Sequence, residues 1–235
     1  MSTKKEQSIQ EIMNNFQEMA DLVLAQLNLI EKVMTGEEEK ENKDLIIKIN
    51  QNEKKIDQYE ISVSDKFINA IVLYQPVASD IRKLVAVYRM IINLERIGDL
   101  VMNISYTIEI LRDSAEYKAM SGVILNMLLS GRMMVEKSLL SFVNSDPDYA
   151  IWTIKNDTIV DEMNQKLLKN SISKARMSAK TREMLLSYAD LKNIITNIER
   201  IADHATNIAE ATIYSLQGTD IRHSGADEES KNTVK

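Results

Sequence analysis

The chain contains the stretch Asn93-Leu94-Glu95-Arg96-Ile97-Gly98-Asp99-Leu100-Val101-Met102-Asn103, and 104 residues later the stretch Asn197-Ile198-Glu199-Arg200-Ile201-Ala202-Asp203-His204-Ala205-Thr206-Asn207. Six of the eleven aligned positions are identical. The same offset of 104 aligns the acids Glu53 and Asp57 with Asp157 and Asp161. Agreement of two separate motifs at one offset indicates an internal duplication. The chain is therefore two copies of one unit, and each copy carries four acids.

The composition predicts an all-α protein. Only 6 Gly and 2 Pro occur in 235 residues, which leaves few helix breakers. Apolar residues recur at helical spacing, as in Ile81, Leu84, Val85, Tyr88 and Ile91. The few breaks that exist divide the chain into six long helices, which we expect at residues 6–35, 41–73, 79–113, 116–143, 147–176 and 180–217.

Short connections between long helices force neighbouring helices to run up and down. Each copy should therefore be a three-helix bundle, and the two tandem bundles should be related by a pseudo-twofold axis. We expect the first bundle at 1–113 and the second at 114–217. The polar residues 218–235 are expected to form a disordered tail, because they contain almost no apolar residue.

The charge balance and residue usage exclude several functions. With 29 basic and 35 acidic residues the net charge is −6, so nucleic acid is not an expected partner. The sequence contains no long uncharged apolar run and no signal-peptide pattern at its N-terminus, which predicts a cytoplasmic protein without membrane insertion. With no Cys and 2 His, any bound metal must be held mainly by oxygen.

The eight duplicated acids are the candidate metal ligands. Residues four apart share one face of a helix, so each acidic pair forms a row. If consecutive antiparallel helices turn their rows towards each other, four carboxylates converge in each half. Such a cluster needs compensating cations. Oxygen ligands select hard ions such as iron, manganese or magnesium, with zinc less favoured, and the spacing permits multinuclear clusters. The candidates are Glu53, Asp57, Glu95, Asp99, Asp157, Asp161, Glu199 and Asp203, with Asn103 and Asn207 as additional ligands or supporting groups.

The alternative interpretation is a solvated acidic face. A single Glu-x-x-x-Asp pattern usually lies in water, and Arg96 and Arg200 could form ordinary ion pairs with the preceding Glu. Recurrence of two acidic pairs in both halves at one offset favours the metal site. His204 follows Asp203 by about 100° of rotation, which predicts a packing or supporting role for it rather than ligation.

The residues of both motifs resemble those of the PhoU family of phosphate-transport regulators. The resemblance rests on Leu94-Glu95-Arg96-Ile97-Gly98-Asp99, on the stretch from Ile198 to Glu210, and on Gln75-Pro76-Val77-Ala78-Ser79-Asp80-Ile81-Arg82 at the entry to the third helix. It covers residues 1 to about 217 in length, order and duplication. It implies two three-helix bundles, with Glu95, Asp99, Glu199 and Asp203 as ligands of multinuclear metal clusters and the four acids of the preceding helices as their companions.

The resemblance also implies a function and partners. It implies a cytoplasmic, non-enzymatic, metal-binding protein that negatively regulates phosphate uptake and the phosphate-starvation response. The implied partners are the ATPase subunit of the phosphate importer and the phosphate sensor histidine kinase, and we expect a homodimer. The sequence departs from the family at Leu100-Val101, where the second copy keeps His204-Ala205, and Lys180 stands where the first copy has Pro76.

Three alternative functions remain. One is a di-metal enzyme of the helical-bundle type, although such enzymes use Glu-x-x-His motifs and neither His lies three residues after any of the eight acids. Another is an accessory protein of a different phosphate transporter. The third is a helical scaffold whose acids are solvated.

Overall fold

The structure is a computed structural model that describes residues 3–36, 38–174 and 181–222, with side chains described outside 164–174 and 181–186. These residues form six α-helices and no strand: α1 (Lys4–Thr35), α2 (Glu39–Tyr74), α3 (Ala78–Leu111), α4 (Ala115–Asn144), α5 (Pro147–Lys174) and α6 (Thr181–Gln217). The expected all-α class and the six long helices are confirmed.

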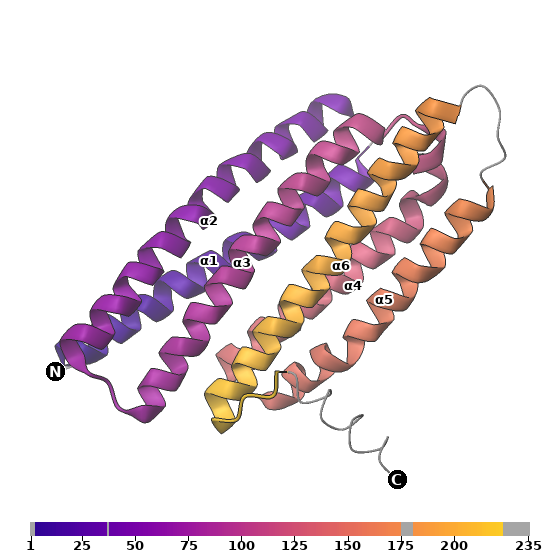
Figure 1. Ribbon diagram of the computed structural model, residues 1–235. Coiled ribbons are helices and arrows are strands. Elements are labelled where there is room, and N and C mark those ends of the chain that lie inside the picture. Colours follow the sequence, from indigo (N-terminus) through magenta and orange to yellow (C-terminus); the bar gives the residue numbers. More distant parts are fainter. Residues whose placement is uncertain (1–2, 37, 175–180, 223–235) are drawn as a thin grey trace, which may run out of the picture.

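The helices form two three-helix bundles side by side, α1–α3 and α4–α6, with α3 lying along α6 between them (Figure 1). Helices α3 and α6 are antiparallel, because Arg89 contacts Tyr214 whereas Asn93, one turn further along α3, contacts Asn207. On another side of the molecule α1 meets α4.

A contact between α1 and α4 locates the pseudo-twofold axis. Arg132 Nη1 donates to Asn28 Oδ1 at 2.6 Å, and these two residues are equivalent under the offset of 104. Two equivalent residues can touch only where the axis passes between them. On α3 and α6, the contact between Asn93 and Asn207 places the axis near the pair Gly98 and Ala202. The axis therefore passes through the centre of the repeated motif.

The two bundles share one hydrophobic core. A single cluster of buried apolar residues contains members from all six helices. Phe16 of α1 and Phe142 of α4 pack edge to face across the junction, with ring centroids 5.4 Å apart. The halves are thus repeats of sequence and shape, but they do not have separate cores.

Local sequence explains several helix ends. The side chain of Asp146 accepts from the backbone N–H of Asp148 at 2.9 Å, so it caps α5 immediately before Pro147. Ser114 caps α4 by accepting from the N–H of Tyr117. Helix α2 ends at Tyr74, and the following residue Gln75 has a positive φ of 43° that turns the chain towards Pro76.

The segment after α6 begins with ordered contacts. Asp220 pairs with Arg222 and lies 3.4 Å from Arg89 of α3, while Ile221 packs against a small cluster of Ala150, Ala209 and Ile213. The remainder of the tail expected from sequence, residues 223–235, lies outside the described residues. Among the described helices, none has a stretch long and apolar enough to cross a membrane.

Candidate metal centres

The four acids of the first half face one another across α2 and α3. Glu53 and Asp57 lie on α2, and Glu95 and Asp99 lie on α3. Burial raises the pKa of the Glu53 carboxyl to about 7, and the charges of Asp99, Asp57 and Glu95 add to this rise. All four carboxylates are therefore within electrostatic reach of one another, as the spacing predicted.

Glu53 is held from a third helix. Its side chain is only 4 % exposed, and its Oε2 accepts from Gln26 Nε2 of α1 at 2.8 Å. The same Gln26 nitrogen donates to the backbone oxygen of Gly98 at 3.3 Å. The other oxygen, Glu53 Oε1, is buried and has no hydrogen-bond partner among the described residues. Sequence reasoning missed Gln26, because its equivalent in the second half is Ser130 and the repeat therefore gives no signal.

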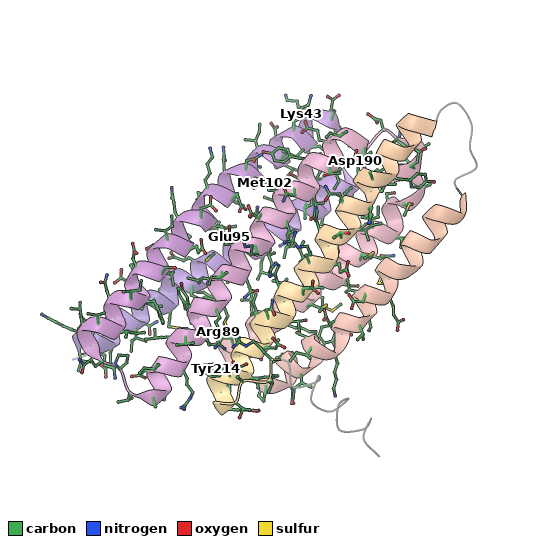
Figure 2. All side chains as sticks on the ribbon, viewed as in Figure 1. Lys43, Arg89, Glu95, Met102, Asp190 and Tyr214 are labelled. Atoms are coloured by element: carbon green, nitrogen blue, oxygen red, sulfur yellow. The ribbon has the colours of Figure 1, made fainter. Side chains whose placement is uncertain are left out.

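Glu95 and Asp99 form a row on α3 beside Arg96 (Figure 2 labels Glu95). Burial, followed by the charge of Asp99, raises the pKa of Glu95. Arg96 Nε lies 3.5 Å from Glu95 and its Nη1 lies 3.8 Å from Asp99, and the Arg96 side chain is 55 % exposed. Such long, solvated pairs contribute little. Arg96 therefore does pair with Glu95 and Asp99, but it offsets the repulsion between their negative charges only weakly.

A further acid, Glu60, belongs to this surface. Its charge contributes to the raised pKa of Glu95. It stands three residues after Asp57 and seven after Glu53, which places it on the same face of α2. The duplication could not identify it, because the equivalent residue is Asn164. The helical spacing of α2 alone was the available signal.

The second half repeats the arrangement on α5 and α6. Burial raises the pKa of Asp157 to about 6, and Asp203 and Asp161 add to the rise. Burial also raises the pKa of Asp203, with Glu199 and Asp161 as further causes. Asp157 Oδ1 is buried and lacks a hydrogen-bond partner within the described part of the chain. The structure thus brings Asp157, Asp161, Glu199 and Asp203 together as the sequence predicted.

The two asparagines offered as additional ligands take different positions. Asn207 Nδ2 donates to Asn93 Oδ1 of α3 at 3.1 Å, so this side chain turns towards the contact between the bundles. Asn103 is exposed on α3. His204 Nδ1 also lies 2.9 Å from Asn93 Oδ1. Burial, helped by the charges of Arg200 and Arg96, lowers the pKa of His204 to about 4. His204 therefore packs between the bundles as a neutral group.

The carboxylate oxygens of these acids are suitable ligands for a hard cation, but the side chains do not surround a single ion position. Among the described side chains, no group of three or more carboxylates or histidines is placed to hold a single ion. Each half nevertheless contains a buried carboxylate oxygen without a donor, in Glu53 and in Asp157. A bound cation would stabilise the ionised form of these groups, which burial now disfavours. The donor chemistry of these residues therefore suits a hard cation, although the described side chains do not form a closed site.

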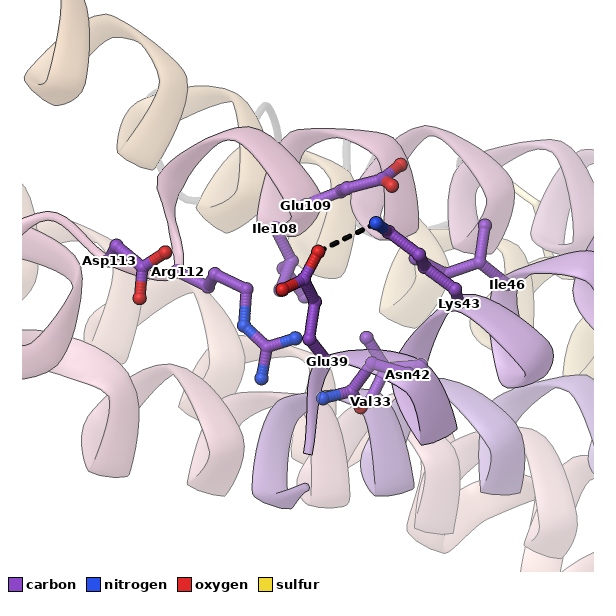
Figure 3. Close-up of a pocket in the computed structure, with 9 residues that line it drawn as sticks. All are labelled: Val33, Glu39, Asn42, Lys43, Ile46, Ile108, Glu109, Arg112 and Asp113. Atoms are coloured by element: carbon purple, nitrogen blue, oxygen red, sulfur yellow. Dashed lines mark hydrogen bonds and ion pairs between the residues drawn. The ribbon is translucent and has the colours of Figure 1, made fainter. Parts of the chain in front are cut away.

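A separate cavity of about 240 Å³ lies where the α1–α2 connection meets the end of α3 (Figure 3). Lys43 Nζ pairs with Glu39 at 2.6 Å, and Arg112 donates to the backbone oxygen of Gly36 at 2.9 Å. Glu109 and Asp113 also line the cavity. Its acids and bases largely compensate each other, and Lys43 stands ten residues, about 15 Å of helix, from Glu53. The cavity is therefore distinct from the acidic rows.

Comparison with known proteins gives relatives over most of the chain. The chain is 32 % identical over 180 residues to a phosphate-specific transport system accessory protein PhoU homolog from Burkholderia sp., covering 75 % of this chain and 74 % of that protein. It is 26 % identical over 188 residues to the accessory protein PhoU of Escherichia coli K12, covering 80 % and 76 % of the two chains.

Solved structures share the fold. The crystal structure of PhoU from Pseudomonas aeruginosa superimposes with a TM-score of 0.74 at 22 % identity, covering 90 % of this chain and 98 % of that one. The regulatory protein PhoU from Streptococcus pneumoniae gives a TM-score of 0.71 at 21 % identity, covering 92 % and 99 %.

The sequence model of the PhoU domain family matches the chain twice, at residues 16–108 and 124–212. Each match includes one pair of acidic rows, so the duplication found in the sequence coincides with two copies of this domain. Since the two matches span most of the chain, this protein belongs to the PhoU family.

Proposed function

We propose that this protein is a cytoplasmic, metal-binding regulator of phosphate transport. The observation that carries the proposal is the match of the PhoU domain to both halves, each with its own pair of acidic rows. The relatives from Burkholderia and Escherichia coli are named accessory proteins of the phosphate-specific transport system. The solved relative from Streptococcus pneumoniae is described as a regulatory protein of that system.

In this proposal the eight acids hold hard cations, with iron, manganese or magnesium favoured over zinc and with room for more than one ion in each half. Support comes from the raised pKa values of Glu53 and Asp157 and from their buried oxygens without donors. The absence of Cys and the contact of His204 with Asn93 leave oxygen as the main ligand type. A cation would let the acids ionise without repelling one another.

Regulation would take place through contacts between proteins rather than through chemical turnover. The long helices present extended faces for the ATPase subunit of a phosphate importer and for a sensor histidine kinase, and a homodimer would double those faces. The direction of control we propose is negative, so that the protein restrains phosphate uptake and the starvation response when phosphate is abundant.

The decisive experiment is deletion of the gene in its own host, followed by growth in phosphate-rich medium. Expression of phosphate-starvation genes and phosphate uptake should both rise, and the wild-type chain should restore them. A chain with Glu95→Gln and Asp99→Asn should restore them poorly, whereas Glu41→Gln, an exposed acid on α2, should act as wild type. Unchanged expression and uptake in the deletion strain would contradict the regulatory function.

Two alternatives give different outcomes in the same strains. If the protein serves another phosphate transporter, affinity purification should recover that transporter instead of the importer ATPase. If it is a di-metal enzyme, the metal-loaded protein should turn over oxygen or peroxide. The position of His204 against Asn93 argues against the enzyme, because such sites recruit a His from the helix that carries the acids.

A further inference from the structure

The two halves differ at three positions that surround the first acid of each candidate site. Under the offset of 104, Gln26 corresponds to Ser130, Glu53 to Asp157, and Gly98 to Ala202. The first half thus combines a longer acid with a missing Cβ, and the second half combines a shorter acid with a methyl group. These are the differences expected if the acid and the residue opposite it share one space.

The geometry of the first half shows that they do. A Cβ built on Gly98 would lie 2.6 Å from Glu53 Oε2, closer than real Cβ contacts come, and 3.2 Å from its Cδ, which is also tight. The carboxylate therefore occupies the place that a side chain at position 98 would fill. Gln26 then ties it there, because its Nε2 donates both to Glu53 Oε2 at 2.8 Å and to the backbone oxygen of Gly98 at 3.3 Å.

The second half lacks this arrangement. Ala202 is 1 % exposed, so its methyl group is inside the packing, and Asp157 is one methylene too short to require a gap there. Ser130 Oγ donates to the backbone oxygen of Asn126 on its own helix. The polar group that corresponds to Gln26 is thus committed elsewhere, and Asp157 is not tied to α4.

We propose that Gln26, Glu53 and Gly98 form a latch that withdraws one carboxylate from the first candidate site, so that the two halves bind hard cations unequally. This inference rests on the proposed metal function. In the first half a cation can take both oxygens of Glu53 only after the charge-assisted hydrogen bond from Gln26 to Oε2 is broken. Asp157 is approached by the hydroxyl of Thr206 on α6, and no side chain ties it to a backbone oxygen as Gln26 ties Glu53. Loss of one such bond corresponds to roughly 10- to 100-fold weaker binding in the first half.

Binding of Mn²⁺ alone to the full chain tests the inequality. Calorimetric titration of the metal-free protein should resolve a tight and a weak class of sites that differ roughly 10- to 100-fold. Asp203→Asn should remove the tight class, and Asp99→Asn should remove the weak one. The exchange Gln26→Ser with Glu53→Asp and Gly98→Ala, which gives the first half the residues of the second, should merge the two classes.

Equal affinities in the wild type, loss of the tight class in Asp99→Asn, or two classes that persist in the exchange variant would each overturn the proposal. If the wild type binds no Mn²⁺ at all, the proposed metal function fails and the inequality fails with it. Circular dichroism spectra that match the wild type establish that each variant used in the titration is folded.

A thermal-melting cycle tests the latch itself without any metal. Gly98→Ala alone should lower Tm by roughly 5 °C, because its methyl group collides with Glu53. Glu53→Asp should rescue much of that loss when combined with Gly98→Ala, since the shorter acid vacates the space. Losses of Tm that simply add in the double variant would show that the two residues do not share one space, and the latch would be rejected.

Discussion

Raising the pH should destabilise the metal-free protein, and Glu53→Gln should remove a defined part of that loss. Burial raises the pKa of Glu53 from its ordinary value of 4.5 to about 7 in the folded state. A raised pKa means that the folded state binds the proton more tightly than the unfolded chain does. Stability from this group is therefore fully present below about pH 4.5 and is lost as the pH rises through about 7.

The magnitude follows from the size of the shift. Each pKa unit corresponds to about 1.4 kcal/mol, so the free energy of unfolding should fall by about 3 kcal/mol between pH 4.5 and pH 8 through Glu53 alone. For a chain of this length that is a loss of about 6 to 12 °C in Tm. Asp157, whose pKa is raised to about 6, adds a loss of the same sign at somewhat lower pH.

Thermal melts in the presence of a chelator at pH 5, 6, 7 and 8 measure this effect. Glu53→Gln keeps the size of the side chain and an oxygen that can accept from Gln26, but it cannot ionise. It should match the wild type near pH 5 and exceed it at pH 8, while Glu41→Gln, on the exposed face of α2, should follow the wild type throughout. Parallel curves for Glu53→Gln and the wild type would falsify the assignment of a buried, proton-binding carboxylate.

Three further outcomes are expected. Replacing Glu95 and Asp99 with Ala should empty the first half of metal and leave the second half loaded, so elemental analysis of the natively purified protein should find a reduced but nonzero content, and unchanged content would reject these ligands. Chelation should lower the Tm of the purified protein at pH 7.5 more than at pH 5, because protonation relieves the repulsion between carboxylates; an equal effect at both pH values would favour solvated acids. Asn93→Ala should cost about 1 to 3 kcal/mol by urea unfolding, because it leaves His204 and Asn207 without their shared acceptor, whereas Asn103→Ala on the exposed face of α3 should cost under about 0.5 kcal/mol.

The helices could be predicted from sequence because their signals are local. Asp146 directly before Pro147 is a pair typical of a helix start, and the side chain of Asp146 does cap α5. Helix α2 begins at Glu39, two residues before the expected start, without a side-chain cap. Its first turn carries Glu39 and Glu41, which suit a helix N-terminus, but acids without a capping hydrogen bond do not fix the first residue of a helix.

The proximity of the acids could be predicted because both acidic pairs recur at one offset, and their metal binding stays a prediction. The four acids of each half meet across facing helices, as their spacing indicated. Gln26 and Glu60 could not be found in this way, since their equivalents are Ser130 and Asn164. Their roles depend on how α1 and α2 are rotated against α3, and that rotation is set by packing in three dimensions rather than by any spacing along the chain.

The contact between the bundles could not be predicted from the sequence for a related reason. The spacing predicts Asn207 as an additional ligand or supporting group, because it continues the acidic row of α6, yet its side chain donates to Asn93 across the pseudo-twofold axis. The sequence reveals that two copies exist, but it does not reveal which faces of the copies meet. Only the antiparallel pairing of α3 with α6 decides that Asn93, His204 and Asn207 form one group.

Because α3 pairs with α6, the repeated motif on these two helices both carries acids and forms the contact between the bundles. Asn93 stands two residues before Glu95, and His204 follows Asp203 directly, so the turns that present acids also supply the polar contact between the bundles. Because a helix turn is rigid and the core is continuous across the junction, a change in the spacing of one acidic row must shift the contact or be resisted by it. The turns of α3 and α6 that carry the acids are therefore the same turns that join the two bundles.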